Sequence, residues 1–378
     1  MDPIFPSWHR FISANSHMAM SMKRKIKISI YYLLYCAIIV LLAFSIGEIV
    51  LRLNPQFAET KNHVEWLRSM MTYDELLGWR HVPGAEVSSE TPEYSVRYTI
   101  NSKGLRGEEH SYNKGKRFRI ICPGDSFTFG WGVAAEDRFS DILKNLIGDT
   151  EAVNMGVQGY GIDQELLQLQ REGVKYEPDL IVLYVIPHDL TRACYSKMWD
   201  KPKPRFVLEE GALRLTNVPV PGVDMFSFSN PTLDRIRYQL GNKSYFFYYL
   251  QDRLYNRYAH RINASGDEAI KIELAKAIFT EMQKTAESLK AKLVIIGALP
   301  VELKEFFREK NIYYCPDPLA AYPGNPGDIR YTEFHHPNAS GHRLIAEGIY
   351  DFLIENNLVP EKHIEEQHSP KQNVLTDS

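Results

Sequence analysis

The first candidate for chemistry is a serine in a glycine-bounded turn. The run Phe118–Cys122 is apolar, and Pro123-Gly-Asp-Ser-Phe-Thr-Phe-Gly130 follows it directly. Gly124 permits a tight bend, so Ser126 can present its hydroxyl to a cleft while nearby backbone N–H groups bind an oxyanion. The alternative is an ordinary turn in which Asp125 and Ser126 cap the next helix. This segment alone does not decide between a nucleophile and a cap.

A histidine near the end of the chain supplies the base that a serine nucleophile needs. It lies in Tyr331-Thr-Glu-Phe-His-His-Pro-Asn338, just before an amphipathic stretch. A serine hydroxyl is a weak nucleophile that a histidine activates, and a third group fixes the tautomer of that histidine. Glu333 precedes His336 by three residues, so one loop can supply both groups. His335 is a rival base, and a surface-loop histidine without a catalytic role is the remaining alternative.

The elements that must position these residues are alternating strands and helices. Strands are predicted for five apolar runs, namely Phe118–Cys122, a run ending at Val153-Asn154, Leu180–Ile186, Leu293–Ile296 and Ile312–Cys315. Helices are predicted over Glu136–Leu146, Glu165–Glu172, Glu268–Leu289, Leu303–Glu309 and Gly341–Asn356. This order predicts an α/β fold with a parallel sheet and helices on both faces. Ligands of such sheets bind beyond the carboxyl ends of the strands, where Ser126 lies.

Three regions fall outside this alternation. Residues 55–115 hold short alternating runs and are predicted to form a β-rich preface. Residues 192–265 interrupt the core and carry many aromatic side chains, among them those of Tyr245–Tyr249. We interpret this insertion either as a satellite core or as a lid or wall that faces carbohydrate or lipid beside the site. The polar tail over residues 359–378 is predicted to be disordered.

Together the motifs resemble the SGNH, or GDSL, superfamily of serine esterases and acyl-transfer enzymes. Gly-Asp-Ser with the following threonine and glycine matches its first block, and Val153-Asn-Met-Gly-Val-Gln-Gly159 matches its second. The last block, Asp-x-x-His, is matched by Glu333 and His336, with glutamate in place of aspartate. The resemblance covers the domain predicted over 116–358, apart from the insertion. It implies a three-layer, flavodoxin-like SGNH hydrolase fold.

The resemblance also implies a role for each residue around the serine. Ser126 is the expected nucleophile, His336 the base and Glu333 the partner of that base. The backbone N–H groups of Ser126 and Gly156 are the expected oxyanion donors. Supporting roles are implied for three neighbouring polar residues: Asp125, Asn154 and Asp189.

The third block of the family is altered in this chain. Where the family offers Asn-Asp, with the asparagine amide as an oxyanion donor, this sequence has His188-Asp189. An imidazole N–H can donate as well, but its reach and its protonation differ from those of an amide. Because the loss of one oxyanion donor costs on the order of 10²–10³ in rate, a slow enzyme with His188 in this role is one expectation.

Composition excludes several other classes of protein. The chain carries 44 basic and 47 acidic residues for a net charge of −3, so it lacks the basic excess that nucleic-acid binding needs. Its four cysteines form no CxxC pair, which removes the sequence evidence for a zinc knuckle or a thioredoxin-like site. Cys122 is predicted to be a buried free thiol, and a pairing of Cys194 with Cys315 is left open. We expect no metal and no organic cofactor.

The N-terminal region predicts a membrane anchor. Residues 28–47 carry no charge, and a helix of this length crosses the roughly 30 Å hydrocarbon core of a bilayer. A cleaved signal peptide is the alternative, but its apolar region is shorter, about 7–15 residues. The span is placed over residues 28–53. The basic run Lys23–Lys27 precedes it, which predicts a cytoplasmic tail over 1–27 and places all that follows in the periplasm or at the cell surface.

Three functions are compatible with these observations. The first is an esterase or deacylase outside the membrane that acts on O-acylated carbohydrate or lipid. The second is a transferase that moves an acyl group onto a cell-surface polysaccharide, since the runs Leu76–Trp79 and Asn101–Gly107 resemble the preface of membrane-anchored bacterial members. The third is a binding module that kept the fold while its third block changed. In the first two, Ser126 attacks an ester carbonyl, and water or a second hydroxyl then accepts the acyl group.

Overall fold

The computed structural model describes residues 8–54, 69–198, 201–221, 240, 243–250, 253, 268–332 and 335–363. The chain divides into two compact units, one of residues 1–64 with 230–254 and the other of residues 65–229 with 255–378. Glu333 and residues 364–378 lie outside the described residues. The start of the tail predicted to be disordered over 359–378 is instead ordered, because Glu361–His363 forms a short 3-10 helix and His363 is buried.

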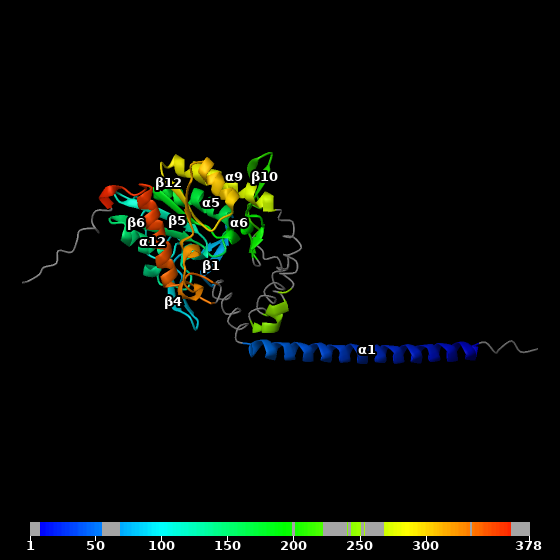
Figure 1. Ribbon diagram of the computed structural model, residues 1–378. Helices are drawn as coiled ribbons and strands as arrows, with labels where there is room; N and C mark the ends of the chain where they lie inside the picture. The colour runs from blue at the N-terminus through cyan, green and yellow to red at the C-terminus, as the bar shows by residue number, and fades with distance from the viewer. Residues whose placement is uncertain are drawn as a thin grey trace, which may run out of the picture. The chain divides into compact units, whose positions relative to one another are not determined.

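The centre of the larger unit is a five-stranded parallel sheet (Figure 1). Its strands are β5 (Phe118–Gly124), β6 (Thr150–Gly156), β7 (Leu180–Tyr184), β12 (Lys292–Gly297) and β13 (Tyr313–Pro316). They lie in the order β13-β12-β7-β5-β6, and each neighbouring pair is parallel. Numbered along the chain, this is the 2-1-3-4-5 order of flavodoxin-like folds. The predicted fold class is therefore confirmed.

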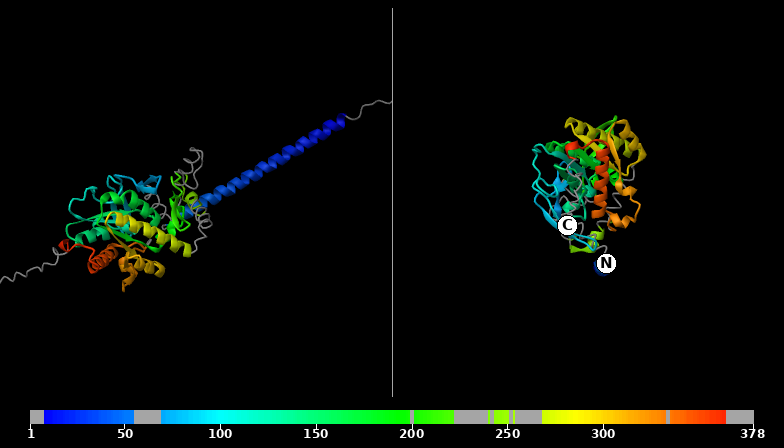
Figure 2. Two further views of the ribbon diagram at one scale, coloured as in Figure 1. Left: turned by 90° about the horizontal axis from the view of Figure 1, so that it is seen from above. Right: turned by 60° about the vertical axis from the view of Figure 1, so that its left-hand side comes forward.

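Helices cover both faces of the sheet, as the alternating order predicts (Figures 1 and 2). One face packs against α5 (Ile162–Arg171), α6 (Pro187–Ala193), α9 (Glu268–Ser288) and α10 (Val301–Glu309). The other face packs against α4 (Phe139–Leu146) and α12 (Ala339–Glu355). Successive strand residues point to opposite layers. In β5, for example, Ile121 faces the first layer, whereas Ile120 and Cys122 face the second.

The predicted end of one strand is wrong. Strand β7 ends at Tyr184, although the apolar run continues to Ile186. Pro187 begins α6, because its fixed φ and missing N–H suit the first turn of a helix. The Asp189 carboxylate then accepts a hydrogen bond of 2.8 Å from the Ile186 N–H and closes that turn. The sequence motif His188-Asp189 consequently lies on a helix that the apolar pattern concealed.

Two antiparallel hairpins precede the sheet within the larger unit. They are β1 (Met71–Asp74) with β2 (Gly78–His81) and β3 (Glu86–Glu90) with β4 (Ser95–Thr99). Two more hairpins belong to the insertion, β8 (Lys197–Met198) with β9 (Lys201–Pro202) and β10 (Arg205–Glu209) with β11 (Ala212–Thr216). Leu77 and Trp79 of the first hairpin join the core on the α5 face. This hairpin is therefore packed against the α/β core.

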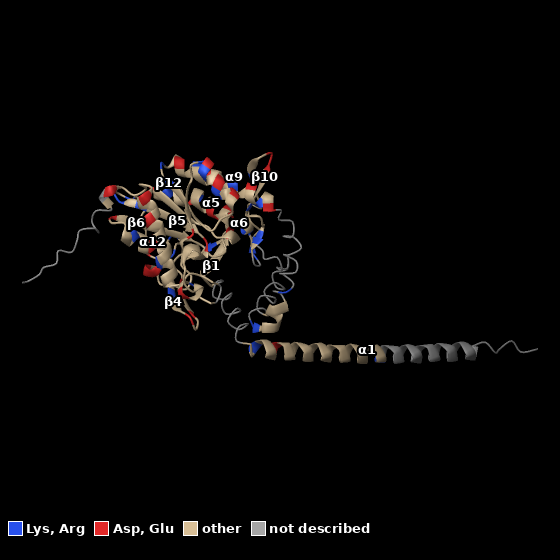
Figure 3. Ribbon diagram, in the orientation of Figure 1, with Lys and Arg blue, Asp and Glu red and all other residues tan. Residues whose placement is uncertain are grey.

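The smaller unit contains α1 (Trp8–Arg52). Between Lys27 and Glu48 this helix carries no charged side chain (Figure 3). By length and composition, Lys27–Arg52 is the one span within the described residues that is long and apolar enough to cross a membrane. A signal sequence would pass the same test.

All four cysteines are free. Cys122 is buried, as predicted, and burial raises the pKa of its thiol. The pairing of Cys194 with Cys315 that the sequence leaves open is absent from this structure.

Candidate active site

The predicted nucleophile begins a short helix at the carboxyl end of the central strand. Helix α3 (Ser126–Phe129) follows β5 directly, and the Asp125 carboxylate caps it by accepting a hydrogen bond of 2.8 Å from the Phe127 N–H. Gly124 has φ +153°, and a Cβ added there would lie 2.1 Å from Thr128 Oγ1. Asp125 therefore provides the predicted cap, whereas the role of Ser126 as a nucleophile stays a prediction.

The two residues expected to form the catalytic pair meet in the structure. His336 Nε2 lies 2.8 Å from Ser126 Oγ, although the two residues are 210 positions apart. The imidazole ring is half-buried beside two aromatic rings, with centroids 5.5 Å from Trp131 and 5.3 Å from Phe127. The rival base His335 is exposed and has φ +52°. Of the two adjacent histidines, His336 is the one that contacts the serine.

The electrostatic surroundings of His336 favour a neutral imidazole at pH 7. Burial lowers the pKa of His336 to about 4, while the Asp125 carboxylate acts in the opposite direction and raises it. In a neutral imidazole, one ring nitrogen carries the proton and the other has a free lone pair. If the Ser126 hydroxyl donates to His336, Nε2 must be the nitrogen with the lone pair. The ring is thus suited to accept the serine proton. Its predicted partner Glu333 lies outside the described residues.

Arg192 joins the polar groups behind Ser126. Its Nη1 atom donates to Asp125 Oδ2 at 2.9 Å, to Asp189 Oδ1 at 2.5 Å and to the Tyr160 carbonyl at 3.0 Å. Ser126 Oγ lies 3.3 Å from the same Asp125 oxygen. One guanidinium therefore connects the turn after β5, the loop after β6 and the helix after β7. Sequence reasoning missed Arg192, because the apolar run before it concealed the helix that places Arg192 one turn after Asp189.

Three fully buried carboxyl groups surround this one guanidinium. Asp125, Asp189 and Glu165 each have a relative exposure of 0%. Both side-chain oxygens of Glu165 lack a hydrogen-bond partner within the described residues. Burial, together with the Asp189 and Asp125 carboxylates, raises the pKa of Glu165 well above its ordinary range. Because two carboxylates already contact Arg192, Glu165 is the group that best holds a proton.

The candidate oxyanion donors differ in part from the expectation. The Gly156 N–H already donates to Asn154 Oδ1 at 3.1 Å. The Asn154 amide in turn donates to the Thr128 carbonyl at 2.6 Å and to Ser140 Oγ at 2.9 Å. Asn154 thus ties β6 to α3 and α4, and its supporting role stays a prediction. Gly159, with φ +76°, is the alternative donor that sequence reasoning missed, and no hydrogen bond of its N–H is found in the described part of the chain.

His188 is the expected donor for which the structure gives no contact. It lies in the first turn of α6 with an exposed side chain. Within the residues that the structure describes, its imidazole makes no hydrogen bond or ion pair. The neighbouring Asp189 is buried and contacts Arg192 and the Ile186 N–H.

The first hairpin of the preface supports the loop after β6. The Trp79 indole donates to the Gln158 carbonyl at 3.0 Å, and His81 Nε2 lies 2.7 Å from Gln158 Oε1. The Tyr160 hydroxyl donates back to the Trp79 carbonyl at 2.6 Å. Burial lowers the pKa of His81 to about 4, so its ring is neutral at pH 7. These contacts fix both residues that flank Gly159.

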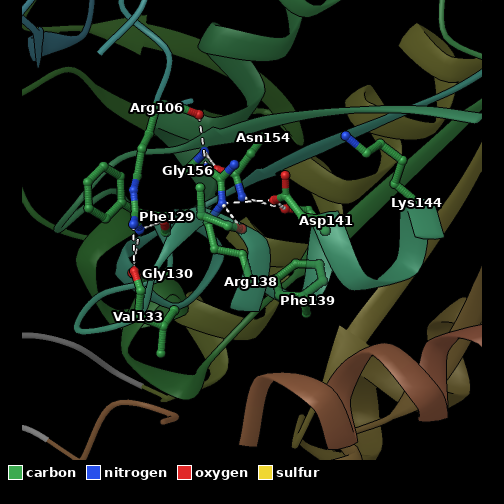
Figure 4. A network of polar contacts seen from close by, with 12 residues as sticks. Arg106, Phe129, Gly130, Val133, Arg138, Phe139, Asp141, Lys144, Asn154 and Gly156 are labelled. Atoms are coloured by element: carbon green, nitrogen blue, oxygen red, sulfur yellow. Dashed lines mark hydrogen bonds and ion pairs between the residues drawn. The ribbon is translucent and has the colours of Figure 1, made fainter. Parts of the chain in front are cut away.

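Arg106 of the preface supports the C-terminal end of α3 (Figure 4). Its guanidinium donates to the Phe129 carbonyl at 2.8 Å and to the carbonyls of Gly130 and Val133 at 2.5 Å. These are carbonyl groups at and beyond the end of α3, which a cation stabilises. Arg138 donates to the Arg106 carbonyl at 2.9 Å and forms an ion pair with Asp141. The preface is therefore part of the framework of the site.

Comparisons with known proteins find similarity among solved structures only. No protein-family model and no curated protein matches the chain. It overlaps a member of the lipolytic protein G-D-S-L family from Veillonella parvula DSM 2008 at 17% identity and a TM-score of 0.32, over 62% of this chain and 97% of that one. It overlaps esterase EstA from Pseudoalteromonas sp. at 12% identity and a TM-score of 0.38, over 63% of this chain and 98% of that one. It overlaps a family 3 carbohydrate esterase from Clostridium thermocellum at 11% identity and a TM-score of 0.38, over 65% of this chain and 100% of that one.

Proposed function

We propose that this chain is a membrane-anchored serine esterase of the SGNH type that cleaves O-acyl esters of a carbohydrate or a lipid. The observation that carries the proposal is the 2.8 Å contact between His336 Nε2 and Ser126 Oγ at the carboxyl end of the sheet. A serine within hydrogen-bond reach of a neutral histidine is the arrangement that nucleophilic catalysis needs. Asp125 and Arg192 hold the turn that presents this serine.

The proposed reaction is a two-step acyl transfer. His336 accepts the proton of Ser126 as the hydroxyl oxygen attacks the ester carbonyl. The oxyanion that forms is stabilised by the backbone N–H groups of Ser126 and Gly159, with His188 as a side-chain donor. His336 then protonates the leaving alcohol, and a water molecule releases the acyl group from Ser126. The predicted partner Glu333 would hold the imidazole in the required tautomer.

We further propose that the enzyme acts outside the cytoplasm. The basic residues Lys23–Lys27 precede the apolar part of α1 and few follow it, which favours a cytoplasmic N-terminus. The larger unit would then face the periplasm or the cell surface, where acylated glycans and lipids are available as substrates.

Labelling with a fluorophosphonate tests the proposed nucleophile. The full-length chain in detergent should be labelled once, and Ser126→Ala should abolish the label. Ser288→Ala is the matched control, because Ser288 is exposed and, among the described residues, its hydroxyl donates only to the Thr285 carbonyl of its own helix. An aryl acetate then tests for turnover. A folded wild-type chain that takes up no label would contradict the proposal and favour a binding module.

A further inference from the structure

The aromatic part of the insertion belongs to the same compact unit as the apolar helix. Residues 230–254 group with residues 1–64, whereas the rest of the insertion groups with the sheet. Within this unit the segment 243–250, Lys-Ser-Tyr-Phe-Phe-Tyr-Tyr-Leu, contacts the last two turns of α1. The segment and the helix are nearly 200 residues apart in sequence.

Glu48 makes the central polar contact between them. Its carboxylate accepts hydrogen bonds from the Ser244 hydroxyl at 2.8 Å, the Phe246 N–H at 2.9 Å and the Tyr245 N–H at 3.2 Å. These N–H groups belong to the first residues of the helical turn that begins at Tyr245, where side-chain carboxylates commonly accept hydrogen bonds from the backbone. Arg52 adds a hydrogen bond of 2.8 Å to the Lys243 carbonyl and lies over the Tyr245 ring. The Glu48 carboxylate therefore accepts hydrogen bonds from the segment and also forms an ion pair with Arg52.

Apolar contacts accompany this polar contact. The Phe246 ring meets Phe44 edge to face with centroids 5.0 Å apart. A Cβ added at Gly47 would lie 2.5 Å from the Phe246 ring, so the glycine permits this close approach. Leu250 remains 39% exposed, and Ile46 and Val50 on α1 are 61% and 59% exposed. The docked segment and the helix thus present apolar surface that no described residue covers.

The position of Glu48 in the sequence indicates how deep residues 243–250 lie in the bilayer. The uncharged run ends at Gly47, and its length matches the hydrocarbon core of a bilayer. Glu48 therefore falls at the boundary between hydrocarbon and headgroups. Tyrosine rings are enriched at this boundary, because one end of the side chain is apolar and the other is polar.

We propose that residues 243–250 are a second membrane-contacting element, which lies among the lipid headgroups and is held to the membrane helix by Glu48. This inference rests on the anchoring that we propose for α1, and it assigns the aromatic segment to lipid rather than to substrate. The chain enters this unit from the catalytic unit near residue 229 and returns near residue 255. The insertion would therefore attach the catalytic unit to the membrane a second time.

Depth-dependent fluorescence quenching tests the inference in the full-length chain. p-Azidophenylalanine replaces Tyr248, an environment-sensitive dye is attached to it, and the protein is reconstituted into phosphatidylcholine vesicles that contain nitroxide lipids. The dye should be quenched more strongly by a headgroup nitroxide than by one near the end of the acyl chain. Leu42 within the span and Tyr112, 39% exposed in the larger unit, are the two reference positions. A dye at Leu42 should be quenched most by the deep nitroxide, and one at Tyr112 by neither.

Glu48→Ala tests the contact that holds the segment. It should abolish quenching at position 248 and leave quenching at position 42 unchanged, whereas Glu281→Ala on the surface of α9 should change neither. Phe246→Ala is a second variant that removes the apolar contact and should also reduce quenching at position 248. Fluorophosphonate labelling of each variant checks that the catalytic unit is intact.

The outcomes separate this inference from the proposed anchoring. Quenching at position 42 without quenching at position 248 would overturn the inference and leave the anchor standing. A dye at position 42 that no lipid quenches would overturn both. Quenching at position 248 that survives Glu48→Ala and Phe246→Ala would overturn the docking on α1.

Discussion

The Arg192 guanidinium donates a hydrogen bond of 2.9 Å to the carboxylate of Asp125, the residue that precedes the candidate nucleophile. The same nitrogen contacts Asp189 and the Tyr160 carbonyl. Arg192 therefore fixes three loops that meet at the edge of the sheet. Since it contacts none of the reacting atoms, we regard it as a positioning residue.

Arg192→Lys should lower kcat without raising KM. Lysine keeps the charge but lacks the planar fork of nitrogens, and the loss of a hydrogen bond to a charged group costs about 1.5–3 kcal/mol. If that loss falls on the transition state, kcat falls by roughly 10–100-fold. Steady-state kinetics on an aryl acetate measure the effect. The control is Arg171→Lys, which alters the ion pair with Asp74 and should leave kcat unchanged. A change in KM alone would contradict the positioning role.

Glu165→Gln should stabilise the protein increasingly as the pH rises. The pKa of Glu165 is raised in the folded state above its unfolded value of about 4.3. Folding therefore takes up a proton, and the stability of the wild type falls as the pH rises above that unfolded value. Glutamine is neutral at every pH and imitates the protonated acid.

The melting temperatures of wild type and Glu165→Gln, measured in detergent at pH 5 and pH 8, check this prediction. The difference in favour of glutamine should be larger at pH 8. Glu273→Gln, at an exposed position on α9, should show no such trend. A variant that is destabilised equally at both pH values would show that Glu165 is ionised and paired in the folded protein.

The sequence was sufficient for those parts of the fold that depend on local pattern. The five apolar runs became the five strands, because strands buried on both faces leave continuous apolar sequence. Ser126 and His336 could be paired through the resemblance, and the structure places them in contact. The end of β7 was missed, since Val185 and Ile186 are as apolar as the strand that they follow.

Contacts that depend on tertiary structure could not be predicted in this way. Arg106 and Arg192 look like ordinary surface cations in the sequence, yet the first is buried beneath α3 and the second lies between two buried carboxylates. The sequence did not distinguish Gly159 from Gly156 as a candidate oxyanion donor. The structure does, because the Gly156 N–H donates to the Asn154 side chain. The hydrogen bonds of Arg106 to the end of α3, and those of Arg192 to Asp125 and Tyr160, are set by the close approach of segments that are distant in the chain.

His188→Ala should lower kcat by about 10²–10³, the effect of removing one oxyanion donor. His188→Asn should retain wild-type activity or exceed it, because an amide N–H donates without depending on protonation. His188 is exposed and makes no hydrogen bond within the described residues, so neither variant should change the melting temperature. His335→Ala, at the exposed neighbour of the proposed base, is the matched control. Full activity of His188→Ala would remove His188 from the oxyanion site.

The pH dependence of kcat/KM should show an acidic limb below the ordinary histidine pKa of about 6.5. Burial lowers the pKa of His336 to about 4, and only the neutral ring can accept the serine proton. Activity should therefore persist as the pH falls through 6.5 and disappear as it approaches the lowered pKa. An acidic limb at or above pH 6.5 would contradict this assignment of the base.

Glu333→Gln tests the predicted partner of that base. A carboxylate beside the imidazole stabilises the imidazolium, so its removal should shift the acidic limb to still lower pH and lower kcat by up to about 10⁴. Glu302→Gln, at an exposed position on α10, should alter neither quantity. If kcat and the acidic limb are both unchanged in Glu333→Gln, the Ser126–His336 pair works without Glu333. In that case Asp125, which already raises the pKa of His336, is the carboxylate that favours the imidazolium.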